Sequence, residues 1–305
     1  GTLYGRNAMA GTLNIITAKP RLGEFSGFAQ AGVSKRSGRE AEAALNVPLG
    51  DSMAVRVAGM KSEKDYGFQN ATRQAIDSGS FSNPDSHAQR AATLKPAGLE
   101  DNWAARVSWR WDRGNAIRLS AMADTARESG TGYPGANVHQ AVTTTGQRAE
   151  TLDLRKVVYR GTEGDMRNQL DGLQLRADVD LGEVALEAVL SRRQVDFYQR
   201  NAASESVHWD GRDYSAIQYD NFSSVYWASK SDSTVAELRL VSTDPTASLQ
   251  WAAGLFHFKE DQQVGFLSVG DRGYCCYSGT EFTMPDTKAK ASAAFVDGTL
   301  KLSPE

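Results

Sequence analysis

The chain has 305 residues, a formal net charge of -3, an isoelectric point near 5.9 and a mean hydropathy of -0.46. No apolar run approaches the roughly 18 residues that a transmembrane helix needs, which excludes a helical membrane protein. Lys and Arg are scattered singly among Asp and Glu, so nucleic acid is not expected as a partner.

Residues 1–20 differ from everything that follows them. Gly5 and Gly11 permit backbone conformations that a β-carbon forbids, and Arg6 offers a planar fork of donors for carboxylates. The chain starts with Gly1 and carries no charged-then-apolar leader, so further segments beyond its ends are expected.

From about residue 24 onward the hydrophobic period is two, which predicts an all-β protein. In the segment 102–112, for example, Trp103, Val107 and Trp111 alternate with polar residues such as Arg106 and Arg110. The predicted strands are 24–34, 39–49, 53–64, 102–112, 115–125, 169–181, 183–197, 233–243, 247–259 and 288–299.

The predicted connections alternate between short and long after the second strand. The short ones are residues 50–52, 113–114, 182 and 244–246, whereas the long ones are 65–101, 126–168, 198–232 and 260–287. Long irregular loops are rare in compact soluble domains. Short turns at one end and long loops at the other are typical of an antiparallel transmembrane β-barrel of the outer-membrane type.

A soluble β-sandwich would alternate in the same way, so the period alone does not choose between water and lipid. The apolar faces are rich in Ala with single Leu or Val, which suits a lipid-facing surface better than a close-packed core. Aromatic residues near the predicted strand ends, namely Trp103, Trp111, Phe197 and Tyr198, fit an interfacial girdle. We expect lipid, and the sandwich stays an alternative.

The opening segment resembles the C-terminal end of the plug domain of TonB-dependent outer-membrane receptors. The residues that carry the resemblance are Gly1, Thr2, Leu3, Tyr4, Gly5, Arg6, Asn7, Gly11, Asn14, Ile15, Ile16 and Thr17. The resemblance implies that 1–20 end a plug, with 14–17 as its last strand, and that 21–305 form the N-terminal part of a barrel of 22 strands. About ten strands are predicted, so the barrel is expected to be incomplete.

The same resemblance implies energy-coupled uptake of a scarce nutrient, most often a ferric siderophore, in the bacterial cell outer membrane. The expected partners are outer-membrane lipid, the TonB energy-coupling complex through a missing N-terminal part, and a small ligand such as a ferric chelate. Arg6 would meet inward-facing acidic residues of the barrel and seat the plug against its wall.

The predicted loop 198–232 is the richest candidate for ligand recognition, because flat aromatic faces and cationic forks can hold an anionic or ring-bearing ligand. The proposed contacts are Tyr198, Arg200, His208, Trp209, Arg212 and Tyr214, with Tyr219, Tyr226 and Trp227 in the same loop. The loop 126–168 adds Arg127, Tyr133, His139 and Tyr159. Several charges are expected to face inward, namely Arg106, Arg110, Arg118, Arg176, Asp178, Glu237 and Arg239.

Catalysis, a resident metal and a cofactor are not expected. The histidines His87, His139, His208 and His257 are far apart, and adjacent Cys275 and Cys276 fit a vicinal disulfide, free thiols or pairing outside the chain. A general porin and a ten-stranded outer-membrane protease, for which His208 and Asp210 would be the pair, remain alternatives.

Overall fold

A computed structural model describes most of the barrel-like part of the chain. The described residues are 17–35, 37–65, 69–70, 95–96, 98–114, 116–132, 141–142, 157–158, 164–208, 218–271 and 277–301. Only the backbone is described for 69–70, 141–142, 157–158, 201–208, 218–224, 269–271 and 277–280. In this part of the chain, no helix is long and apolar enough to cross a membrane.

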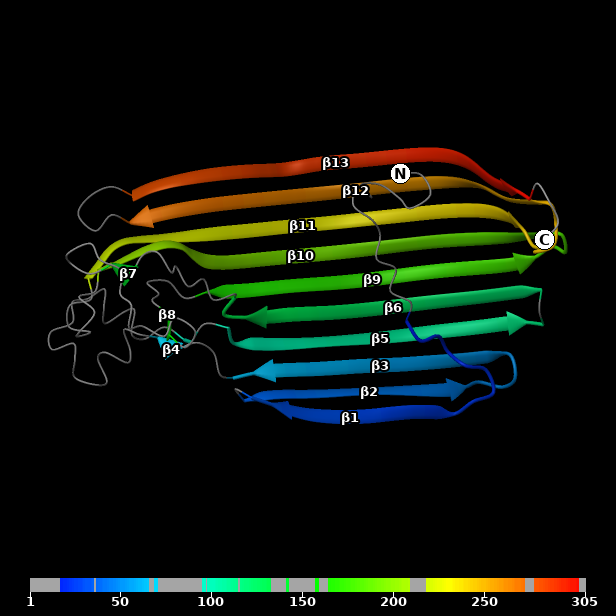
Figure 1. Cartoon of the computed structure of the whole chain (residues 1–305), viewed down its shortest axis with the longest axis horizontal. Coiled ribbons are helices and arrows are strands. Elements are labelled where there is room, and N and C mark those ends of the chain that lie inside the picture. The colour runs from blue at the N-terminus through cyan, green and yellow to red at the C-terminus, as the bar shows by residue number, and fades with distance from the viewer. Residues whose placement is uncertain are drawn as a thin grey trace.

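The described residues form one large antiparallel sheet in which neighbours in sequence are neighbours in space (Figure 1). Its strands are β1 (Ser26–Ser34), β2 (Gly38–Pro48), β3 (Met53–Lys64), β5 (Glu100–Arg113), β6 (Ile117–Gly130), β9 (Asp165–Asp180), β10 (Val184–His208), β11 (Gln218–Ser242), β12 (Leu249–Asp271) and β13 (Tyr277–Leu300). Strand β7 (Ala141–Val142) pairs in parallel with β10, and β4 (Gln69–Asn70) pairs with β8 (Val157–Val158). The result is an up-and-down meander with β1 and β13 at its edges.

Four short turns, β2–β3, β5–β6, β9–β10 and β11–β12, lie at the right-hand end of the sheet in Figure 1, whereas the β1–β2 turn and the long connections join strand ends at the other end. Glycines occupy the tight positions of three of these turns, with φ of 79° at Gly50, 58° at Gly114 and 93° at Gly182. Side chains with a β-carbon adopt these angles at a cost, so glycine stabilises each reversal. The predicted short turns at these positions are confirmed.

Cross-strand registers align the predicted apolar residues into one face. Leu45 pairs with Val57, Val57 with Val107, Val107 with Ala123, and Ala123 with Leu173. We call the side that carries these residues the apolar face and the opposite side, which carries Arg106, Arg110 and Glu237, the polar face. The predicted alternation and the antiparallel all-β fold are therefore confirmed.

The sheet is a single layer without a conventional core. Among the described residues, only Ala44 and Ala54 are buried apolar residues, whereas Leu175, Val107 and Leu255 are 46%, 48% and 59% exposed. An apolar face of this extent needs a cover that the described chain does not supply. This is the arrangement of a barrel wall rather than of a sandwich, in which a second sheet would bury the apolar side.

The prediction of a long loop over 198–232 is wrong. Strand β10 continues to His208 and β11 starts at Gln218, while β12 and β13 likewise extend into the predicted loop 260–287, to Asp271 and from Tyr277. In these extensions both faces carry polar residues, so the hydrophobic period that marks a half-buried strand disappears although the backbone pairing goes on.

Candidate functional site on the polar face

The polar face carries a continuous row of ion pairs at the end with the short turns. Its members, which we call the charge ladder, are Arg110 and Asp112 on β5, Arg118 on β6, Arg176 and Asp178 on β9, Glu187 on β10, and Glu237 and Arg239 on β11. Four cations face four anions, so the ladder is neutral as a whole. Six of the eight were predicted to face inward, and the registers place them on the polar face; Asp112 and Glu187 were not predicted.

The contacts of the ladder link strands as well as residues. Arg110 Nε donates to Asp112 Oδ1 at 2.8 Å, and Arg118 Nε lies 3.5 Å from the other carboxylate oxygen of Asp112. Arg176 Nη2 lies 2.7 Å from Asp178 and 3.4 Å from Glu187 on the next strand. The polar face therefore offers paired charges to whatever lies against it.

Glycines let polar-face side chains reach across a whole strand. Asp124 on β6 meets Arg193 on β10 over Gly172 of the intervening β9, with distances of 2.9 and 3.3 Å between guanidinium nitrogens and carboxylate oxygens. A β-carbon at Gly172 would lie 2.7 Å from Asp124 Oδ1 and 2.8 Å from Arg193 Cζ. The ion pair therefore depends on the missing side chain.

Arg106 lies directly opposite Asp124 in the register of β5 and β6. Its Nε is buried and has no hydrogen-bond partner within the described residues. Two arginines thus flank the carboxylate of Asp124, and Arg193 donates hydrogen bonds to both of its oxygens.

Toward the long connections the polar face becomes aromatic. Trp227 on β11 is paired with Phe266 on β12, and Phe266 with Phe282 on β13, so the three rings form one cross-strand row. Trp227 and Phe266 are edge to face, with ring centroids 5.7 Å apart and planes at 82°. Trp227 is 47% and Phe282 52% exposed. We call these three residues the aromatic row; exposed flat rings are suited to bind a ring-bearing or apolar ligand.

A cavity of about 470 Å³ lies where several strands run into the long connections. Lys64, Lys95 and Arg200 bring cations to it, and Glu100 and Asp165 bring carboxylates. Arg200 and Asp165 are directly opposite one another on β10 and β9. This rim cavity is polar and holds both signs of charge.

Of the six residues predicted to bind ligand, the structure describes the side chains of Tyr198 and Arg200. Tyr198 and Arg200 lie on the apolar-face side of β10, beyond its apolar part, and the guanidinium of Arg167 lies 4.8 Å from the Tyr198 ring centroid. His208 ends β10, and its side chain is outside the described residues together with Trp209, Arg212 and Tyr214. The plug-motif residues 1–16 are outside it too, and only Thr17 is described.

The expected aromatic girdle is only partly correct. Trp103 and Trp111 lie at the two ends of the apolar part of β5, as predicted, but Phe197 is opposite Asn168 and Ser229 on the polar face. Consecutive residues of a strand point to opposite faces of the sheet, so Phe197 and Tyr198 cannot lie on the same face.

The sequence reasoning missed Phe266 and Phe282, because neither stands in a run of aromatic residues. They lie on the same face as Trp227 and directly opposite it across the strands, and this can be recognised only when the registers of β11, β12 and β13 are known. Among the described residues, no group of three or more His, Cys, Asp or Glu side chains is arranged to hold a metal ion.

The segment that leads into β1 is fixed to the polar face by one fully buried side chain. Asn46 Oδ1 accepts from the backbone N–H of Arg21 at 2.9 Å, and its Nδ2 donates to the carbonyls of Arg21 at 2.9 Å and Glu24 at 2.5 Å. The chain therefore reaches the first strand from the polar side of the sheet.

No family model and no curated protein matches the sequence. Solved structures do match it, although at low sequence identity. The ferric yersiniabactin uptake receptor FyuA from Yersinia pestis has 13% identity and a TM-score of 0.63 over 97% of this chain and 46% of its own. The siderophore receptor PiuA from Acinetobacter baumannii has 10% identity and a TM-score of 0.62, over 97% of this chain and 43% of its own.

Pseudomonas aeruginosa FpvA, solved with pyoverdine and iron, has 9% identity and a TM-score of 0.58, over 94% of this chain and 41% of its own. The chain thus spans less than half the length of these receptors. At such identities the comparison concerns the fold, and it agrees with the resemblance of residues 1–20. The chain has the fold of part of the β-barrel of TonB-dependent siderophore receptors.

Proposed function

We propose that this chain is the plug-to-barrel junction and part of the barrel wall of an outer-membrane receptor for TonB-dependent uptake of a ferric siderophore. The observation that carries the proposal is the single-layer meander with one uncovered apolar face, whose neighbours in fold are siderophore receptors. A lipid bilayer covers such a face without a second protein layer.

In this proposal residues 1–20 end the plug, residues 21–305 belong to the barrel, and further strands close the edges of β1 and β13. Unpaired strand edges are costly in lipid, which is why closure is required. The clasp of Asn46 on Arg21 and Glu24 supports a junction on the polar side, since a plug must enter the lumen there.

The polar face then lines the lumen, and its two ends have different roles. The neutral charge ladder faces the plug, where paired charges can exchange partners without leaving a net charge buried. The aromatic row contacts the ligand from the polar face, and His208, Trp209, Arg212 and Tyr214 contact it at the end with the long connections, whereas Tyr198 and Arg200 lie on the other face of β10 and are not part of this site.

Iron is cargo in this scheme and arrives inside its chelate. Flat rings bind the organic shell of a siderophore, and arginines pair with its negative charge. The protein therefore acts by recognition and gating, and no covalent step is assigned to it.

The test is uptake of a panel of labelled ferric siderophores by cells that make the protein, with and without a proton gradient. Gradient-dependent uptake of one or more siderophores is the expected result. Uptake that continues after the gradient is collapsed, and that extends to unrelated small solutes, would favour a porin and overturn the proposal.

The ligand-binding part is tested separately with Trp227→Ala and Phe266→Ala. Each variant is expected to weaken uptake at low siderophore concentration while leaving the amount of protein in the membrane unchanged. The control is Phe295→Ala, because Phe295 lies over Gly254 near the charge ladder and far along the strand from the aromatic row.

A further inference from the structure

The apolar face ends on almost every strand at a charged residue. Followed from the short turns toward the long connections, β10 places Leu186, Ala188 and Leu190 on this face and then Arg192. On β12 the first charge is Lys259, which follows Leu255 and His257 on the same face. The apolar part of the sheet therefore ends at a sharp border on the side of the long connections.

This border is mainly cationic. The first charge is a cation on β2, β3, β6, β10, β12 and β13, and these residues are Arg39, Lys61, Arg127, Arg192, Lys259 and Lys290. On β5, β9 and β11 the first charge is Asp101, Asp171 or Asp232, and Asp101 and Asp232 are each paired with a border cation, Lys61 and Arg192.

The cations are closest together on β10 to β13. Arg192 is opposite Thr234, Thr234 opposite Lys259, and Lys259 opposite Lys290, so one line across four strands holds three cations, which we call the cation row. Lys259 lies 2.8 Å from Asp261, but Lys290 forms no hydrogen bond or ion pair within the described part of the chain. Two lysines directly opposite each other repel unless an anion lies between them.

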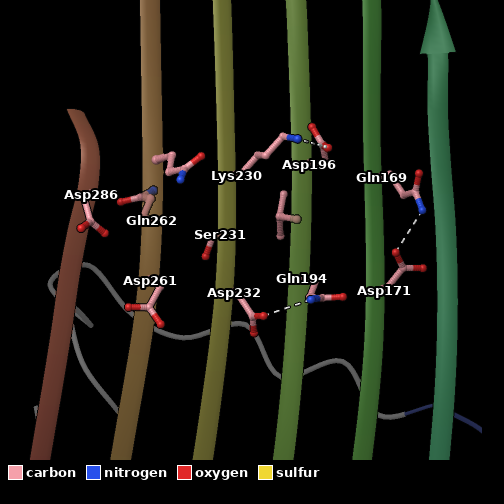
Figure 2. A pocket seen from close by; sticks show the side chains of 12 residues that line it. Gln169, Asp171, Gln194, Asp196, Lys230, Ser231, Asp232, Asp261, Gln262 and Asp286 are labelled. Carbon is pink, nitrogen blue, oxygen red and sulfur yellow. Dashed lines mark hydrogen bonds and ion pairs between the residues drawn. The ribbon is translucent and has the colours of Figure 1, made fainter. Parts of the chain in front are cut away.

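One step further from the apolar part, the charged residues of β9, β11 and β12 are carboxylates, whereas β13 carries Lys288 opposite Asp261. Figure 2 shows Asp171, Gln194, Asp232 and Asp261 in a line across β9 to β12, over a shallow depression of about 450 Å³. On β9 to β12 this side of the sheet is thus layered, with apolar residues first, then the border charges that include the cation row, and then carboxylates and amides.

We infer that the cation row binds the phosphate groups of anionic lipid in the membrane leaflet next to the long connections. This inference rests on the proposed function, because it needs the apolar face to lie in lipid. The order of the layers matches such a leaflet: acyl chains meet the apolar residues, phosphates meet Arg192, Lys259 and Lys290, and polar headgroups meet the amides and carboxylates beyond them.

Charge complementarity favours a lipid phosphate over a protein partner. The cations continue the border of the lipid-facing band around several strands instead of forming a compact patch, and they stand two residues, roughly 7 Å, beyond the last uncharged row on their strands. A phosphate between Lys259 and Lys290 would remove their mutual repulsion.

The experiment compares lipid binding by the delipidated full protein, purified from membranes in nonionic detergent, with that of Lys259→Gln/Lys290→Gln. The probe is diphosphorylated lipid A, followed by native mass spectrometry at low salt with EDTA present. The control, Arg113→Gln/Lys301→Gln, also removes two positive charges, but at the ends of β5 and β13 that lie by the short turns. Lipid A without phosphates is the second probe.

Each lysine near an anionic lipid surface is worth about fivefold in affinity, so the double variant is expected to bind roughly twenty-fivefold more weakly. The control variant should bind as the unchanged protein does. Equal binding by the double variant, or equal binding of dephosphorylated lipid A, would overturn the inference. If the unchanged protein binds lipid A without EDTA but not with it, the inference is overturned too, because the carboxylates would then bind the phosphates through a divalent cation.

Failure of the inference and failure of the proposed function give different results. If the double variant still takes up siderophore and binds lipid A as well as the unchanged protein does, only the lipid site is wrong. If the unchanged protein is absent from the outer-membrane fraction, the proposed function is wrong and the lipid site with it.

Discussion

Replacing Gly172 with valine is expected to separate Asp124 from Arg193. A β-carbon at this position would lie within 2.8 Å of both side chains, and each of them can move away only by giving up the contact over β9. Asp124 is 11% exposed and Arg193 42%, so the pair is partly shielded from water. Its loss costs about 1–2 kcal/mol, less than a fully buried pair would.

The substitution also has a favourable component, because valine is a better strand residue than glycine by about 1 kcal/mol. Gly265→Val isolates that component, since a β-carbon there meets nothing within 4 Å. Urea unfolding in lipid vesicles, followed by tryptophan fluorescence, should show Gly172→Val less stable than Gly265→Val by about 1–2 kcal/mol.

The Arg193→Gln background tests the cause. There the difference between the two valine variants should shrink to a few tenths of a kcal/mol, because no ion pair is left to break. A difference that persists in this background, or two valine variants of equal stability in the unchanged protein, would refute the role assigned to Gly172.

Three further predictions follow from described contacts. Asn46→Leu should release residues 21–24, seen as faster amide exchange of Arg21, whereas Gln30→Leu, which removes an exposed bond to Glu42, should not. Arg192 and Gln194 lower the pKa of Asp232 from 3.8 to about 2, so this carboxylate stabilises the fold above pH 3.8 and stops doing so as the pH falls to about 2. Asp232→Asn should flatten the acid-unfolding curve in that window, and an unchanged curve would contradict the assignment. Phe282→Ala should weaken siderophore binding about tenfold, as the loss of one exposed stacking ring of roughly 1–1.5 kcal/mol implies, without lowering stability by more than about 1 kcal/mol.

The long connections show where sequence reasoning reaches its limit. Strands 39–49, 53–64 and 102–112 were predicted within two residues at each end, because an apolar face in lipid imposes a strict period of two. Beyond the cation row, residues 198–208 and 218–232 are still paired in strands, but polar and aromatic residues follow one another there without a hydrophobic period of two. Backbone hydrogen bonds maintain the strand pairing there, and they do not require any pattern of side-chain hydropathy that the sequence would show.

The candidate site was only partly predictable for a related reason. The inward charges Arg110, Arg176 and Glu237 followed from parity within one strand, and parity is a local property. Their partners on other strands depend on register, as Glu187 does for Arg176.

The sequence by itself determined the class of fold, the two faces of each strand and the positions of the tight turns, since these depend on alternation and on glycine at positive φ. Only the tertiary structure decided which residues meet between strands. Asp124 meets Arg193 across 69 positions of chain, and Trp227, Phe266 and Phe282 align from three strands. Register sums the turn lengths and bulges of every connection, and a one-residue shift in any of them would reverse the face of each of these side chains.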